Sequence, residues 1–328
     1  MTASRVLVTD CDLPGTPVED ALSAAGIDAA RAAEATPDVF ADAGAEVEAL
    51  VVQWARITGE VMDTMPKLRI ISRLGIGYDM IDVDAATARG IAVANTPSYC
   101  IEEVAAHTVA MIMAEARGLA SYDRAVREGT WRAVDARPAA VRPSATTVSV
   151  LGFGRIGSLV ARSLRGIGFR VLVADPYASV DAIAAAGCEA ATIADAVAAA
   201  DVLTLHVPLT AETHHLIDAA ALATMRAGAV IVNTCRGPLV DEDALVAALD
   251  AGTIAGAALD VFAAEPLPTE SVLRGRDDVL LTPHAAWYSP EALVDLPIHA
   301  AQNVIDFLSG SAGAAIVNRD YARVAAGN

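Results

Sequence analysis

Three polar residues in separate segments are of types that together can bind an anion and transfer a proton. A guanidinium presents a planar fork to carboxylate and carbonyl oxygens, and an imidazole exchanges a proton near neutral pH. A carboxylate bonded to one imidazole nitrogen stabilises the protonated ring and orients it. These residues, each with its segment, are Arg236 (VNTCRG), Glu265 (LDVFAAEP) and His284 (TPHAAWY).

Taken singly, each of the three residues also has an ordinary structural explanation, because loops carry many polar groups. Arg236 could be a surface residue at a strand end, Glu265 a loop residue, and His284 a turn histidine. All three segments, however, are expected at the carboxyl ends of strands, where ligands bind in doubly wound sheets. Together they favour a site in which Arg236 grips a 2-keto acid while His284, held by Glu265, protonates the alkoxide formed by hydride transfer.

A glycine-rich turn in the run TVSVLGFGRIG predicts the dinucleotide site that such a reaction needs. Gly152 permits a tight turn, Gly154 lets the backbone approach a pyrophosphate, and Gly157 lets the following helix pack on the strand. The next strand ends in Asp175, 18 residues after Gly157. A carboxylate there can accept hydrogen bonds from ribose hydroxyls and repel a 2′-phosphate, so NAD is expected rather than NADP.

Short β-branched runs alternate with alanine-rich helical stretches, which predicts an α/β protein with parallel sheets. A chain of 328 residues is long enough for two domains. Long helices expected at about 101–128 and 290–308 flank a central block, and this suggests one domain inserted into another. Strands are expected at 5–9, 49–53, 69–74, 91–94, 147–151, 170–175, 202–206, 229–233, 256–261 and 279–282.

Charge and cysteine content exclude several classes of protein. Lys and Arg number 23 against 41 Asp and Glu, and the net charge of −18 argues against a nucleic-acid or anionic-membrane partner. The four cysteines lack the spacing of a metal site, so we expect no metal and a reducing, cytoplasmic setting. No leader-like or membrane-length apolar run is evident, which predicts a soluble protein.

The motifs resemble those of the D-isomer specific 2-hydroxyacid dehydrogenase family and, within it, the C-terminal-binding-protein-like branch. The resemblance implies a Rossmann NAD-binding domain at 102–287, inserted into a flavodoxin-like substrate domain at 1–101 and 288–328. It also implies an active site in the cleft, a homodimer, and NAD-dependent interconversion of a 2-keto acid and a D-2-hydroxy acid. The matching segments are RLGIGYDMIDVDAATARGIAVANTP, LGFGRIG, ADPY, HHLI, VNTCRGPLVDEDAL, GAALDVFAAEP and TPHAAWYS.

The same resemblance implies a set of cofactor contacts. Asp260 could accept from the nicotinamide carboxamide or simply be an acidic strand end, and Arg155 could cover the pyrophosphate or lie on the surface. Cys235 stands where the family commonly has Ala or Ser, and we expect it to pack against the cofactor rather than react. The contacts are Gly152, Gly154, Arg155, Ile156, Gly157, Asp175, Val207, Pro208, Thr213, Thr234, Cys235, Asp260 and His284.

Substrate contacts are expected from both predicted domains. The glycine-rich segment RLGIG could bind a carboxylate through backbone N–H groups, with Arg73 adding charge or forming a structural ion pair. Trp287 resembles a pocket-lining tryptophan of the C-terminal-binding-protein-like branch, although helix-start packing is the alternative. The contacts are Arg73, Ile76, Gly77, Arg236 and Trp287.

An aromatic wall favours a keto acid with an uncharged side chain, and a phosphorylated substrate is disfavoured because there is no extra basic cluster and no C-terminal regulatory domain. Glyoxylate, hydroxypyruvate and branched keto acids stay open. A second interpretation is an NAD(H)-sensing dimeric scaffold with little turnover; the intact Arg, Glu and His set favours catalysis over it. The remaining histidines, His107, His214, His215 and His299, are expected to be structural or surface residues.

Overall fold

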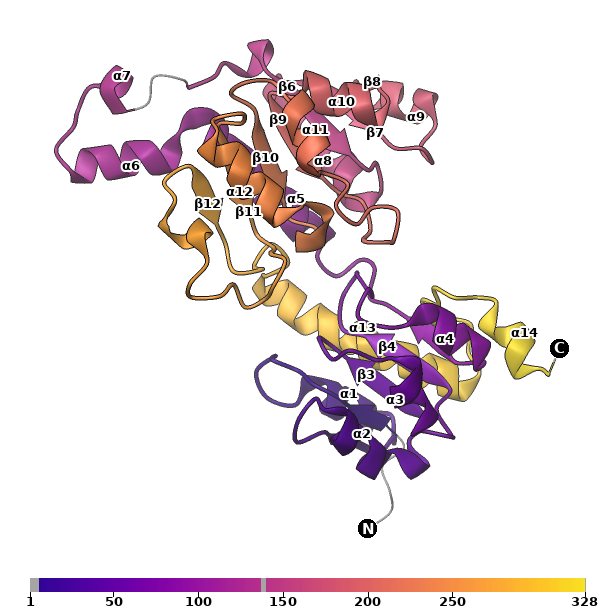
Figure 1. Ribbon diagram of the computed structural model, residues 1–328. Coiled ribbons are helices and arrows are strands. Elements are labelled where there is room, and N and C mark those ends of the chain that lie inside the picture. Colours follow the sequence, from indigo (N-terminus) through magenta and orange to yellow (C-terminus); the bar gives the residue numbers. More distant parts are fainter. Residues whose placement is uncertain (1–5, 137–139, 328) are drawn as a thin grey trace. The chain divides into compact units, whose positions relative to one another are not determined.

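A computed structural model describes residues 6–136 and 140–327 of the chain (Figure 1). The chain forms two compact units. Unit 1 comprises Met1–Tyr99 and Ser289–Asn328, and unit 2 comprises Cys100–Tyr288. Both units contain a parallel sheet, so the predicted α/β class is confirmed.

Unit 1 is built on a five-stranded parallel sheet with the order β2-β1-β3-β4-β5, which is the flavodoxin-like order. Its central strands are nearly continuous apolar runs because both faces of the sheet are buried. The strands are β1 (Val6–Val8), β2 (Ala29–Arg31), β3 (Ala49–Val52), β4 (Ile70–Arg73) and β5 (Ala92–Ala94). The helices are α1 (Pro17–Ala24), α2 (Pro37–Ala43), α3 (Gly59–Asp63), α4 (Val83–Ala88), α13 (Pro290–Ser309) and α14 (Tyr321–Ala325), with a 3₁₀ turn η1 (Gly44–Glu46).

Unit 2 is built on a seven-stranded parallel sheet with the order β12-β11-β10-β9-β6-β7-β8. This is the Rossmann order with one further strand, and the order reverses between β6 and β9. The strands are β6 (Thr147–Leu151), β7 (Arg170–Ala174), β8 (Glu189–Ala190), β9 (Val202–Leu205), β10 (Val230–Asn233), β11 (Gly256–Leu259) and β12 (Val279–Leu281). The helices are α5 (Ile101–Arg117), α6 (Leu119–Arg127), α7 (Ala133–Ala136), α8 (Arg155–Ile167), α9 (Val180–Ala185), α10 (Ile193–Ala199), α11 (Ala219–Thr224) and α12 (Glu242–Asp250), with 3₁₀ turns η2 (Pro143–Ala145), η3 (Gly237–Leu239) and η4 (Val272–Gly275).

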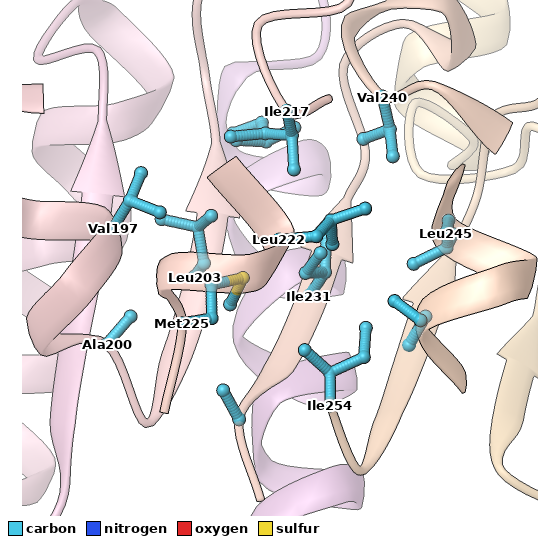
Figure 2. Close-up of a cluster of buried hydrophobic side chains, with 14 of the residues drawn as sticks. Val197, Ala200, Leu203, Ile217, Leu222, Met225, Ile231, Val240, Leu245 and Ile254 are labelled. Carbon is cyan, nitrogen blue, oxygen red and sulfur yellow. The ribbon is translucent and has the colours of Figure 1, made fainter. Parts of the chain in front are cut away.

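Two apolar clusters cover opposite faces of the sheet of unit 2. Ile231 of β10 points into the cluster that α10, α11 and α12 complete, where it lies with Leu222 and Leu245 (Figure 2). Its neighbours Val230 and Val232 point into the other cluster, which α5 and α8 complete. Because successive side chains of a strand alternate between faces, packing on both sides fixes the register and the position of the strand ends.

The long helix expected at about 101–128 is broken in the structure. Gly118 has a φ of 64°, in the left-handed region, and separates α5 from α6. The spacing of apolar residues in the sequence places Leu119 on the same helix face as apolar residues between 104 and 112, and this is wrong for Leu119, which is 57% exposed. The other residues of that predicted face are buried, namely Val104, Thr108, Met111 and Ile112.

The predicted strands all occur, and their ends differ from the prediction by at most two residues. Two edge strands, β2 and β8, were not predicted. For the helix after the glycine turn, the sequence predicts residues Ser158–Arg165, and the structure extends this helix to Arg155–Ile167. Over the described ranges, no helix combines the length and apolar character needed to cross a membrane.

Candidate active site

The turn between β6 and α8 forms a cradle in which two glycines exclude any side chain. A Cβ on Gly152 (φ 95°) would lie 2.4 Å from the carbonyl oxygen of His206, and one on Gly157 would lie 2.1 Å from that of Gly152. A Cβ on Gly154 would meet nothing within 4 Å, so the turn is open there. Open space next to the N-terminus of the 13-residue helix α8 suits a pyrophosphate. The residues present therefore fit NAD.

Asp175 follows β7 and is tied to this turn. Its Oδ2 accepts from the N–H of Phe153 at 2.6 Å, and its Oδ1 accepts from the N–H of Tyr177 at 2.8 Å. Each carboxylate oxygen has two lone pairs, so both can still accept from a ribose hydroxyl. Beside it, Arg155 is exposed as the first residue of α8, and Ile156 packs partly into the core. Their cofactor contacts stay predictions.

The segment that follows β9 is held by a hydrogen bond within itself and by a second one to the loop after β10. The hydroxyl of Thr213 donates to the carbonyl of Pro208 at 2.6 Å, and the thiol of Cys235 donates to the carbonyl of Val207 at 2.9 Å. The hydrogen bond of Cys235 is consistent with a packing role. Burial lowers the pKa of nearby His206 to about 4, so this ring is neutral at physiological pH.

Arg236 lies in the loop that follows β10, here called the arginine loop (residues 234–240). Asn233 braces this loop from both sides: its Oδ1 accepts from the N–H of Cys235 at 3.0 Å, and its Nδ2 donates to the carbonyl of Arg236 at 2.8 Å. The guanidinium also donates to the carbonyl of Cys235 at 2.7 Å. Gly237 packs so closely on residues 262–263 that a Cβ there would lie 1.9 Å from the carbonyl oxygen of Phe262.

His284 and Glu265 form a direct pair. Nδ1 of His284 lies 2.6 Å from Oε2 of Glu265, whose Oε1 accepts from the N–H of Phe262 at 2.9 Å. Burial favours the neutral form of Glu265, but the hydrogen bond and charge of His284, the Phe262 N–H and the charge of Arg236 outweigh it and hold the pKa of this carboxyl below its usual value. The structure thus brings Arg236, Glu265 and His284 together.

Asp260 holds the loop that carries His284, here called the histidine loop (residues 282–288). His284 has a φ of 52°, which is strained for a residue with a Cβ, and its N–H donates to the carbonyl of Asp260 at 2.8 Å. The Asp260 carboxylate accepts from the Thr282 hydroxyl at 2.5 Å and from the N–H groups of Ala285 at 2.8 Å and Ala286 at 2.9 Å.

These contacts give Asp260 a positioning role in the histidine loop. The residue is 0% exposed, and three donors surround its carboxylate. Its expected contact with the nicotinamide carboxamide stays a prediction. Sequence reasoning did not identify the bracing residues Asn233, Gly237 and Thr282, although all three lie inside or beside the motifs that carry the catalytic candidates.

The predicted substrate contacts are divided between the units. In unit 2, Trp287 is partly buried and packs edge-on against Tyr288, with ring centroids 5.9 Å apart. In unit 1, buried Arg73 ends β4, and its guanidinium lies 5.4 Å from the ring centroid of Trp54. The carbonyl of Ile76 accepts from Asn95 at 2.7 Å. The substrate roles of Arg73, Ile76, Gly77 and Trp287 stay predictions.

A Rossmann sheet with an open glycine cradle and a histidine–carboxylate pair at its strand ends defines a nicotinamide-dependent dehydrogenase. Comparison with known proteins narrows the class. Residues 109–286 match the family model described as D-isomer specific 2-hydroxyacid dehydrogenase, NAD binding domain. The chain belongs to the D-isomer specific 2-hydroxyacid dehydrogenase family. It is an NAD-dependent oxidoreductase that acts on CH–OH groups.

Individual relatives agree with this assignment. The chain is 41% identical over 271 residues to glyoxylate reductase of Korarchaeum cryptofilum, covering 82% of this chain and 81% of that protein. It is 39% identical over 285 residues to D-3-phosphoglycerate dehydrogenase of Mycobacterium tuberculosis, covering 84% of this chain but only 53% of that protein. The crystal structure of D-lactate dehydrogenase from Aquifex aeolicus, complexed with NAD and lactic acid, is similar with a TM-score of 0.86 and 28% identity, covering 95% of this chain and 98% of that chain.

These relatives confirm the family and the predicted fold class, a Rossmann domain with a flavodoxin-like companion. They do not single out a branch, so membership of the C-terminal-binding-protein-like branch stays a prediction.

Proposed function

We propose that this protein reduces a small 2-keto acid to the D-2-hydroxy acid, and catalyses the reverse reaction, with Arg236, Glu265 and His284 as the catalytic residues. The observation that carries the proposal is the 2.6 Å contact between His284 Nδ1 and Glu265 Oε2, close to the charge of Arg236. A histidine that must give a proton to an alkoxide and later take it back needs such a carboxylate partner.

Each protein group then has a defined task. Arg236 binds the substrate carboxylate and polarises the keto oxygen through its charge. Since Nδ1 of His284 is engaged by Glu265, Nε2 is the nitrogen that transfers the proton to the forming alkoxide. Glu265 stabilises the imidazolium before the transfer and keeps the ring oriented after it. NADH, when bound, supplies the hydride.

The glycine turn would hold the cofactor. Gly152 and Gly157 keep the space clear of side chains, and the open position at Gly154 admits the pyrophosphate. Asp175, fixed by the N–H groups of Phe153 and Tyr177, would accept from the ribose hydroxyls and disfavour a 2′-phosphate. The remaining expected cofactor contacts lie on the loops that follow β9 and β10.

A small keto acid with an uncharged side chain is the substrate class that we propose. The indole of Trp287 supplies an apolar surface within the histidine loop, three residues after His284. The similarity to a glyoxylate reductase over most of both chains agrees with this class.

A homodimer is also proposed. Helix α6 and the segment after it project from the rest of unit 2 (Figure 1) and expose apolar side chains that a second copy could cover. These are Leu119, Val126, Trp131 and Val134. None of the four described cysteines forms a disulfide bond, which agrees with the proposed cytoplasmic location.

The test is a panel of keto acids followed by NADH absorbance: glyoxylate, hydroxypyruvate, 2-ketoisovalerate and phosphohydroxypyruvate. We expect turnover with at least one keto acid whose side chain is uncharged, and a much lower kcat/KM with phosphohydroxypyruvate. Binding of NADH without turnover on any member would instead support the NAD(H)-sensing scaffold, and a preference for phosphohydroxypyruvate would overturn the proposed substrate class.

A further inference from the structure

Helix α5 carries two adjacent polar residues that reach the two loops of the proposed site. His107 Nε2 lies 3.1 Å from Thr282 Oγ1, in the histidine loop. Thr108 Oγ1 lies 2.7 Å from Thr234 Oγ1, in the arginine loop. Thr282 and Thr234 each precede their proposed catalytic residue by two positions. One turn of one helix therefore contacts both loops.

The donors and acceptors of the first contact follow from its neighbours. The Thr282 hydroxyl donates its only proton to Oδ1 of Asp260, at 2.5 Å. Thr282 must then accept from His107, so Nε2 of His107 carries a hydrogen. Asp260 in turn accepts the N–H groups of Ala285 and Ala286. A continuous chain of hydrogen bonds thus runs from α5 to the backbone that holds the strained His284.

The donor and acceptor of the second contact, between Thr108 and Thr234, are assigned in the same way. The hydroxyl of Thr108 donates to the carbonyl of Val104, one turn earlier in α5, at 2.7 Å. Its oxygen must therefore accept the proton of Thr234, and this fixes the side-chain rotamer of Thr234. Thr108 is 0% exposed and Thr234 is 7% exposed. At buried positions, the loss of one hydroxyl leaves the other without a hydrogen-bond partner, and this lowers the stability of the folded state.

We infer that His107 and Thr108 are positioning residues of the proposed active site, His107 ordering the histidine loop and Thr108 the arginine loop. The inference rests on the proposed function, because it assigns the two loops their catalytic roles. His107 acts through Thr282 and Asp260, and Thr108 acts through Thr234. This gives His107 a specific task in place of the structural or surface role expected from the sequence.

The decisive comparison for His107 is His107→Leu against His107→Gln. Leucine removes the donor, whereas the glutamine amide can place an N–H near the position of Nε2. Amide hydrogen exchange measures the order of the histidine loop directly. We expect the amides of Ala285 and Ala286 to exchange about tenfold faster in the leucine variant, and kcat for keto-acid reduction to fall by about tenfold, while the glutamine variant stays near wild type.

Thr108→Val and Thr108→Ser form the matching pair for the arginine loop. Valine should raise KM for the keto acid more than it lowers kcat, because the loop carries the proposed carboxylate clamp, and serine should restore the wild-type value. His299→Leu, on the exposed face of α13 in unit 1, is the control and should change neither exchange nor kinetics.

Equal behaviour of the leucine and glutamine variants, or wild-type exchange of Ala285 and Ala286 in His107→Leu, would overturn the role of His107. Equal KM values in Thr108→Val and wild type would overturn that of Thr108. If the wild-type protein reduces no keto acid, the proposed function fails, but the exchange comparison still decides whether α5 orders the histidine loop.

Discussion

Gly237 lies against the backbone of Phe262, with its Cβ position 1.9 Å from the carbonyl oxygen. The arginine loop and the segment that leads to Glu265 are therefore in direct backbone contact. The N–H of the same Phe262 donates to Glu265 at 2.9 Å. The backbone of Phe262 thus contacts both segments and sets the distance between Arg236, the proposed substrate clamp, and Glu265, the carboxylate partner of His284.

Gly237→Ala should separate these two segments. A Cβ cannot occupy a position under 2 Å from backbone atoms, so we expect a loss of about 1–3 kcal/mol in the free energy of unfolding, as for an overpacked core. The kcat/KM for the keto acid should fall by about tenfold or more, since Arg236 is displaced. Gly275→Ala is the control, because a Cβ there meets nothing within 4 Å. Wild-type kcat/KM in Gly237→Ala would contradict the close packing.

Glu265→Gln should slow the reduction. Hydrogen bonds and charges outweigh burial and hold the pKa of Glu265 below its usual 4.5, so the carboxylate is ionised throughout the working range. Without this charge beside Nδ1, the ring of His284 is less well oriented, and kcat for keto-acid reduction at about pH 7 should fall by about tenfold or more.

The same lowered pKa has a consequence for stability. The contribution of the ionised pair is present above pH 4.5 and is lost as the pH falls through the lowered pKa. Glu270→Gln, at an exposed position nearby, should leave both kcat and the acid stability unchanged. A wild-type kcat and an unchanged acid stability in Glu265→Gln would count against the pairing.

Asp175→Asn should relax the choice of cofactor. Asparagine keeps an oxygen that accepts from Phe153 or Tyr177 but removes the charge that repels a 2′-phosphate. The ratio of kcat/KM with NADH to that with NADPH should fall by about tenfold or more. Asp181→Asn, an exposed change in α9, is the control. The same selectivity in the Asp175 variant and wild type would refute the role of this carboxylate.

His206 should make the protein less stable in mild acid. Burial lowers its folded pKa from 6.5 to about 4, so between these values the unfolded chain binds the proton and the folded chain does not. Stability attributable to this residue is therefore present above pH 6.5 and declines as the pH falls towards 4. Between about pH 7 and pH 5 the loss should be about 2 kcal/mol.

Urea unfolding of wild type and His206→Gln at the two pH values measures this loss. The variant should show a smaller decrease in the free energy of unfolding, and His299→Gln should behave like wild type. Identical decreases in His206→Gln and wild type would show that the ring is not held neutral.

The elements that could be predicted are those whose residue types and spacing are distinctive within a short segment of the sequence. The glycine turn, the strands with β-branched runs and the helix at Pro290–Ser309 were all expected. The edge strands β2 and β8 were missed because AAR and EA contain no β-branched residue and gain their pairing only from a neighbouring strand. The break at Gly118 was missed because the amphipathic pattern continues through it.

Contacts between distant segments could not be predicted in this way. His107 and Thr282 are 175 residues apart, and no spacing rule connects them. The resemblance implies a cofactor contact for Asp260, but no pattern in the sequence shows that the fold of the histidine loop encloses its carboxylate. The residue types suggested the pairing of His284 with Glu265, but the residues that hold the pair in place became visible only in three dimensions.

The most direct measurement is keto-acid reduction by His284→Ala, followed by NADH absorbance, with NADH binding measured by fluorescence. We predict that kcat falls by orders of magnitude while the Kd for NADH stays close to wild type. His215→Ala, at the other described non-glycine position with a positive φ, is the matched control and should keep its activity. A wild-type kcat in His284→Ala would contradict the assignment of His284 as the group that transfers the proton.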